Sequence, residues 1–228
     1  MKIINRILLV ILLLLLAAAG GLILGRPYIV DLQRQQAEAA IYSLIEGGQT
    51  EIEFNYLPEM EGEQFQEMEA FSAEYAEIPD ASDNGEKRSV VGYGLIEIPA
   101  IDLEMPLVKG ADNYSLRAAA GWWPQSAEMG TAGNCAVFGH RMVTYGRHFN
   151  RLDELNPEDQ IFLYNTEGKK FTYTVTATEV IEPSVLLDTL YEHNEGFQLT
   201  LVTCTPTGVG DHRLLVYAEM RTSADLEE

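Results

Sequence analysis

A strictly alternating run between Phe171 and Thr178 constrains the fold of this chain more than any other feature. Its apolar residues, Phe171, Tyr173, Val175 and Ala177, alternate with four threonines. Such period-two alternation is typical of a β-strand with one buried and one wetted face.

The chain from Val90 onward contains further strand candidates and only short helical pieces. The strand candidates are VVGYGLIEIPAIDLEMPLV, NCAVFGH, QIFLYN, KKFTYTVTATEVIE, FQLTLVTC and RLLVYAEM. The helical pieces are NYSLRAA, RHFNRLDEL and SVLLDTL. Residues 90–221 therefore predict a mainly β domain, a closed β-barrel of seven or eight strands with short helices, followed by a tail over 222–228.

An apolar run, Ile7–Leu24, follows Lys2 and Arg6 near the N-terminus. Its length of about 18 residues suits a membrane-spanning helix. Positive charge before the run and acidic residues after it place the rest of the chain outside the membrane. We predict that residues 1–26 are an uncleaved anchor of a single-pass cell-membrane protein whose main domain is extracellular. The alternative is a signal peptide cleaved at the alanines 17–19.

Residues 27–89 are predicted to form an acidic helical stalk and linker. The first helix has an imperfect apolar stripe made of Ile29, Leu32, Ala39, Tyr42 and Leu44. A second amphipathic stretch carries Phe65, Met68 and Tyr75. Residues 31–88 hold 15 acidic and 3 basic side chains, a net charge of −12. This segment is either solvated or folded back over the following domain as a lid.

The overall charge and the cysteine content exclude several classes of function. A net charge of −20 opposes nucleic-acid binding, which needs basic surface to neutralise phosphates. Cys135 and Cys204 are too few for a disulfide framework. Neither a His-Glu-x-x-His or Cys-x-x-Cys spacing nor a calcium loop is recognisable. We therefore expect no metal site.

Three residues with complementary chemistry lie at the ends of predicted strands. Cys204 ends FQLTLVTC, His140 ends NCAVFGH and Arg213 begins RLLVYAEM. A thiol attacks as the thiolate and needs a base or cation nearby, and a developing oxyanion needs donors. One rim of a barrel can bring such strand ends together. Cys204, His140 and Arg213 are therefore candidate catalytic residues, with Arg141 as the alternative arginine.

The segments around these residues resemble the sortase family. TLVTC followed by TPTGVGDHRLLV is similar to the cysteine and arginine strands of sortases. GNCAVFGHR followed by HFNRLDEL is similar to their histidine segment, and YTVTATEVIEPS to the strand between. The resemblance covers residues from about 90 to 220 and is nearest to class C, the pilus-assembling type. The class stays open, because no Asp-Pro-aromatic lid motif occurs before Val90 and no second apolar span follows Met220.

This resemblance implies a membrane-anchored transpeptidase at the surface of a Gram-positive cell. Cys204 would cleave an LPXTG-like sorting signal between Thr and Gly through a thioester. An amine on a cell-wall precursor or on a pilin lysine would then resolve the thioester. His140 would serve as general acid and base, and Arg213 would hold the substrate backbone or the oxyanion. Thr203 would assist through its hydroxyl or its amide, and the reaction would need no cofactor.

Two other functions stay open at this point: an exported cysteine protease that hydrolyses the acyl-enzyme, and a non-enzymatic, membrane-tethered interaction module. If Cys204 is catalytic, we expect its thiol to be accessible and more reactive than that of Cys135. Cys135 is predicted to be a core residue, although a Cys135–Cys204 disulfide is an alternative. The remaining predictions concern structural roles: packing for Trp122 and Trp123, surface positions for His148 and His193, and a loop position for His212.

Overall fold

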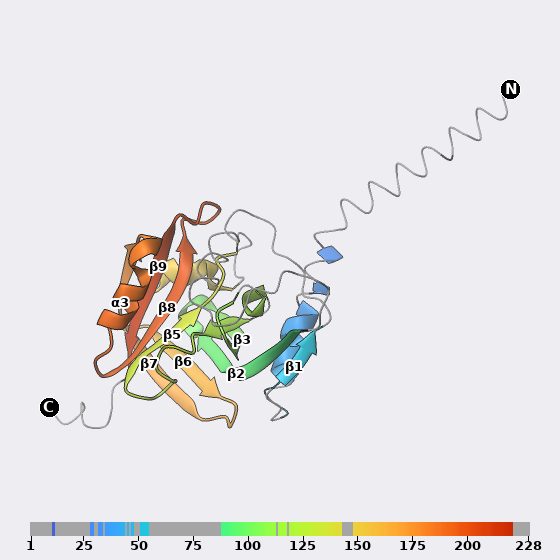
Figure 1. Cartoon of the computed structure of the whole chain (residues 1–228), viewed down its shortest axis with the longest axis horizontal. Helices are drawn as coiled ribbons and strands as arrows, with labels where there is room; N and C mark the ends of the chain where they lie inside the picture. Colours follow the sequence, from blue (N-terminus) through green and yellow to red (C-terminus); the bar gives the residue numbers. More distant parts are fainter. Residues whose placement is uncertain are drawn as a thin grey trace.

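The fold is taken from a computed structural model of the chain, shown in Figure 1. It describes residues 11, 28–29, 32–33, 35–43, 45, 47, 51–54, 88–112, 114–117, 119–142 and 148–220. The predicted membrane anchor, apart from residue 11, lies outside these residues, as do the second amphipathic stretch and the tail. Within the described ranges, no helix combines the length and the apolar character that crossing a membrane requires.

Eight strands of the described chain close into a barrel, which confirms the predicted fold. Around the barrel they run β2–β3–β4–β5–β8–β9–β7–β6, and antiparallel pairing of β6 with β2 closes the ring. A ninth strand, β1, pairs with residues 88–91 of β2, ahead of the stretch that pairs with β6. The bounds are β1 Glu51–Phe54, β2 Arg88–Ile98, β3 Leu103–Lys109, β4 Ala120–Trp122, β5 Gly133–Phe138, β6 Gln160–Asn165, β7 Lys170–Ile181, β8 Phe197–Thr205 and β9 His212–Glu219.

Short helices connect the strands, as the sequence predicts. They are η1 Pro99–Ile101, η2 Ser115–Arg117, η3 Phe149–Glu154, η4 Pro183–Val185 and α3 Leu186–Glu192. In Figure 1, α3 lies beside β8 and β9 on the outside of the barrel. Its residues Leu186 and Leu190 bury there against Phe138, Val202 and Leu215. We call this group, which also contains Cys204, the outer cluster.

The alternation of β7 holds only for its first half. Phe171, Tyr173 and Val175 are buried in the barrel interior, but Ala177 is exposed. The pairing of β7 with β9 shifts register between Val175 and Ala177. One extra residue moves every following side chain to the other face of a strand, so the predicted buried position of Ala177 is wrong.

The helix before β1, which we call the N-terminal helix and which includes residues 35–43, packs on the barrel with a different face from the one predicted. Ala37, Ile41 and Ile45, spaced four residues apart, bury against Val90 and Val108. Of the predicted stripe, Ile29, Leu32 and Ala39 are exposed. The buried positions are instead Ala37, Ile41 and Ile45, none of which belongs to the predicted stripe. In Figure 1 the helix, drawn in blue, lies next to β1 and the start of β2.

Candidate functional site

Cys204 and Arg213 face each other across two neighbouring strands. They are direct partners in the antiparallel ladder of β8 and β9. Side chains of such partners lie on the same face with their Cβ atoms about 5 Å apart. Cys204 belongs to the outer cluster, and alternation along β9 puts Arg213 on the same side as Leu215 of that cluster.

The Arg213 guanidinium is buried and anchored to the backbone of the loop before it. Its side chain is only 2% exposed. Nη1 donates hydrogen bonds to the carbonyl oxygens of Gly210 at 2.9 Å and His212 at 3.0 Å. Because a guanidinium presents five N–H groups in a rigid plane, these bonds orient the remaining donors of Arg213 as well.

His140 follows β5, which runs parallel to β8. The ladder ends at the pair Phe138 and Val202. The Gly139 amide then donates to the Val202 carbonyl at 3.1 Å. Continued by two residues, this register sets His140 beside Cys204. The predicted candidates therefore converge at one end of the barrel: Cys204 and Arg213 lie on adjacent strands, and His140 lies just after a third.

Thr203 has a structural contact next to the site. Its side chain is 1% exposed, and Oγ1 donates a hydrogen bond of 2.7 Å to the carbonyl oxygen of Gly139. Because neighbouring residues of a strand point to opposite faces, this hydroxyl points away from the face that carries Cys204. It ties β8 to the residue before His140.

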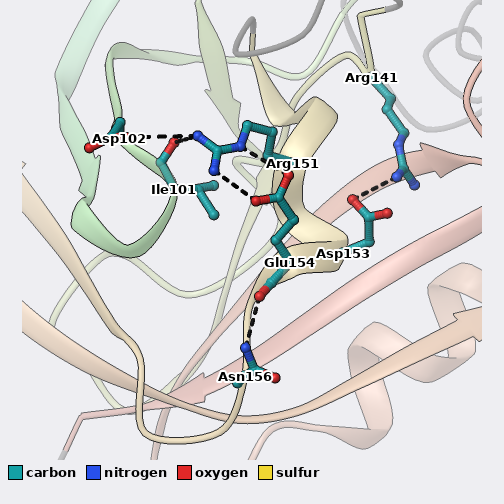
Figure 2. Close-up of polar contacts among 7 residues, drawn as sticks. All are labelled: Ile101, Asp102, Arg141, Arg151, Asp153, Glu154 and Asn156. Atoms are coloured by element: carbon teal, nitrogen blue, oxygen red, sulfur yellow. Dashed lines mark hydrogen bonds and ion pairs between the residues drawn. The ribbon is translucent and has the colours of Figure 1, made fainter.

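Arg141 bonds to a different set of groups from Arg213. Its Nη1 donates to Thr205 Oγ1 at 2.9 Å, and its Nη2 lies 2.7 Å from Asp153 Oδ1 of η3. Figure 2 shows the contact with Asp153. Of the two candidate arginines, Arg213 is the one in register with Cys204.

Both cysteines are free and buried, so the predicted accessibility of Cys204 is wrong and the alternative disulfide is contradicted. Cys135 is 1% exposed inside the barrel, as predicted for a core residue, and burial raises the pKa of its thiol. Cys204 is 2% exposed but lies in the outer cluster. The two thiols therefore lie on opposite sides of the barrel wall.

The other histidines differ from each other in environment. His148 is buried, with Nε2 3.7 Å from Glu38 Oε1 of the N-terminal helix, so its predicted surface position is wrong. The polar residues around it gave no sign of that covering helix. His193 is half-buried and stacks on Tyr217 with ring centroids 4.4 Å apart. His212 begins β9, and its hydrogen bond to Asp211, together with Glu182, raises its pKa.

Trp122 and Trp123 have the packing roles that the sequence predicts. Trp122 stacks on Tyr93 with centroids 4.3 Å apart, and Trp123 meets Phe138 edge-on at 6.4 Å. Both are buried. Among the residues that the structure describes, no group of His, Cys, Asp and Glu side chains is arranged to hold a metal ion.

Comparisons with known proteins agree with this geometry. The sortase domain family matches residues 96–221. Sortase A of Bacillus anthracis is 30% identical over 145 residues, which are 64% of this chain and 65% of that protein. Sortase D of Bacillus subtilis is 30% identical over 132 residues, covering 57% and 64%. The chain thus spans slightly less than two thirds of the length of these relatives.

A solved structure of sortase C from Streptococcus pneumoniae has the same fold. It superimposes with a TM-score of 0.53 at 28% identity, covering 70% of this chain and 87% of that one. The family match extends from within β2 to just beyond β9 and includes His140, Cys204 and Arg213. The chain therefore belongs to the sortase family.

Proposed function

We propose that this protein is a cysteine transpeptidase that cleaves an LPXTG-like sorting signal and joins the cleaved protein to an amine. The observation that supports this most is the convergence of Cys204, His140 and Arg213 on adjacent strand ends. Membership of the sortase family supports the same reaction. A nucleophile, a proton carrier and a fixed cation are the parts that acyl transfer needs.

In the first half of the reaction, the Cys204 thiolate attacks the carbonyl carbon of the signal's Thr–Gly bond. The C–N bond breaks, and His140 in its protonated form gives a proton to the departing glycine amine. The product is a thioester between Cys204 and the threonine. In the second half, an amine attacks this thioester, His140 takes up the amine's proton, and the Cys204 thiolate is released.

Arg213 stabilises the negative charge that develops on the carbonyl oxygen or holds the substrate backbone. Its burial strengthens this effect, because charges interact more strongly away from water. The bonds to Gly210 and His212 fix the guanidinium before the substrate arrives. Thr203 contributes by holding the backbone beside His140 rather than by touching the substrate.

The proposed setting is the outer face of the cell membrane, with residues 1–26 as the anchor and residues 90–221 as the catalytic domain. The charge pattern around the apolar run Ile7–Leu24 supports this orientation. The acceptor amine belongs to a cell-wall precursor or to a pilin lysine. Solved relatives include pilus-related sortase C enzymes, which is consistent with the second acceptor. Because Cys204 is buried, the substrate reaches it only when neighbouring groups move.

Intact-mass spectrometry tests this function. The full chain in detergent is mixed with a library of LPXTG-like peptides, beside the variants Cys204→Ala and Cys135→Ala. We expect a mass gain equal to the peptide up to its threonine in the wild type and in Cys135→Ala, but not in Cys204→Ala. An adduct that survives in Cys204→Ala, or no adduct with any peptide, would contradict the proposal.

Product analysis separates transpeptidation from hydrolysis. Added to the acyl-enzyme, an amine such as triglycine or a lysine-containing pilin peptide should become joined to the threonine of the signal. If only the free acid forms at every amine concentration, the protein is a cysteine protease instead.

A further inference from the structure

The segment that carries His140 continues past the end of its strand. The ladder between β5 and β8 ends at Phe138, and the last backbone bond is that from Gly139 to Val202. β8 itself runs on to Thr205. Residues 139–141 therefore lie beside residues 203–205 beyond the regular strand pairing, and side chains supply bonds between them.

Two side-chain bonds continue the register across this stretch. Thr203 Oγ1 donates to the Gly139 carbonyl at 2.7 Å. Arg141 Nη1 donates to Thr205 Oγ1 at 2.9 Å. The first joins position 139 to 203 and the second joins 141 to 205. One bond therefore lies one residue before the pair His140 and Cys204, and the other lies one residue after it.

The Arg141 bond is held in place by a second group. Nη2 of the same guanidinium lies 2.7 Å from Asp153 (Figure 2). Together with the bond to Thr205, this contact sets the plane of Arg141 from two directions. The Arg141 side chain is 6% exposed and that of Asp153 is 54% exposed. An ion pair with so exposed a partner contributes little to stability. The contact with Asp153 therefore orients the Arg141 guanidinium rather than stabilising the fold.

The helix that carries Asp153 is itself fastened to the barrel. Arg151 of η3 donates to the Ile101 carbonyl at 2.7 Å and forms a two-pronged pair with Glu154, at 3.0 and 2.7 Å (Figure 2). Such two-pronged arginine–carboxylate pairs have well-defined geometry. The pair with Glu154 lies within η3. The bond to Ile101 of η1 and the burial of Phe149 and Leu152 in the barrel interior hold η3 in place, and Asp153 of this helix contacts Arg141.

From this arrangement we infer that Thr203 and Arg141 are positioning residues that hold the imidazole of His140 at reacting distance from the thiol of Cys204. The inference rests on the proposed function, because it assigns the two bonds to the same catalytic pair. Proton transfer between two side chains depends steeply on their separation. A displacement of about 1 Å in a catalytic group can cost about a hundredfold in rate.

Matched variants separate positioning from stability. Thr203→Val removes one bond, and Arg141→Met removes the other while keeping an unbranched chain of similar length. The control for the first is Thr200→Val, which removes an equally buried hydroxyl bond between β8 and Asn134 of β5. The control for the second is Arg117→Met, which removes a comparably buried arginine from η2, a helix that takes no part in the two bonds.

The main readout is the pH dependence of Cys204 alkylation by iodoacetamide, followed by mass spectrometry of the full chain carrying Cys135→Ala. A protonated imidazole beside a thiol favours the thiolate, so alkylation of a properly placed Cys204 should begin below the pH of about 8.5 that is typical of an isolated thiol. In Thr203→Val and Arg141→Met, the pH of half-maximal alkylation should therefore rise by about one unit. With a reactive peptide, kcat/KM should fall about tenfold or more while KM stays within about twofold. Thr203→Ser, which keeps the hydroxyl, should behave like the wild type.

Both controls should lower Tm without moving the alkylation profile. The inference is overturned if Thr203→Val and Arg141→Met keep the wild-type profile, or if the two controls shift it equally. Alkylation needs no peptide substrate. A protein that forms no acyl-enzyme but shows the predicted shifts would therefore contradict the proposed function and leave the positioning roles supported.

Discussion

Replacing Gly139 by alanine should destabilise the protein and distort the segment around His140. A Cβ atom at position 139 would lie 2.6, 2.7 and 2.9 Å from three ring carbons of Phe149. Carbon atoms pack best at about 3.5–4.0 Å, so the ring has to retreat by about 1 Å. Phe149 is fully buried, and its amide donates to the His140 carbonyl at 3.0 Å. The ring therefore cannot move without disturbing His140.

Two effects of opposite sign determine the size of the change. Overpacking a well-filled core costs about 1–3 kcal/mol. A glycine-to-alanine change stabilises by about 0.4–1 kcal/mol through the unfolded chain. The clash is the larger effect, and we expect a net loss of about 1–2 kcal/mol in the free energy of unfolding. Urea denaturation followed by tryptophan fluorescence measures this loss as a lower midpoint with an unchanged slope.

A double-mutant cycle with Phe149→Leu tests the stated cause. Leucine is less extended than the phenylalanine ring and leaves room for the new methyl group. The double variant should be more stable than the sum of the two single losses predicts, with a coupling energy of about 1 kcal/mol. Gly139→Ala with an unchanged midpoint, or a cycle without coupling, would refute the argument that the ring requires glycine here.

Two further predictions concern other parts of the molecule. Ile41→Asp puts a charge where the N-terminal helix buries against the barrel. It should lower the free energy of unfolding, measured by urea denaturation, by more than about 3 kcal/mol. As a control, Ala39→Asp at the exposed neighbouring position should lower it by less than about 1 kcal/mol. Burial raises the pKa of the Cys135 thiol, so the folded protein keeps its proton above pH of about 8.5, where the unfolded chain releases it. Stability should therefore fall with rising pH in this range. The advantage of the wild type over Cys135→Ala should shrink by up to about 1.4 kcal/mol per pH unit, and a constant difference from pH 7 to 10 would contradict this.

Much of the barrel could be predicted because its strands carry their pattern locally. The strands β5 to β9 all match segments that composition and alternation single out. β4 is the exception, because it has only three residues, Ala120–Trp122. A pairing of that length leaves no periodic signal.

The burial of individual residues was harder to predict, because it depends on what covers them. Ala177 follows the alternation of β7, yet a bulge turns it outward. His148 lies in a polar segment, yet the N-terminal helix brings Glu38 over it. Neither the bulge nor the covering helix can be recognised from the residues next to these positions in the sequence.

The sequence alone determined the strand content of this protein and the chemical types at the strand ends, since both depend on residues that are close together in the chain. Only the tertiary structure decided that His140 lies beside Cys204, since the bond from Thr203 to Gly139 joins residues 64 positions apart. It also decided that Arg213 rather than Arg141 stands opposite the thiol. Strand register is fixed by long-range pairing and packing, and a local pattern does not specify which strand end meets which.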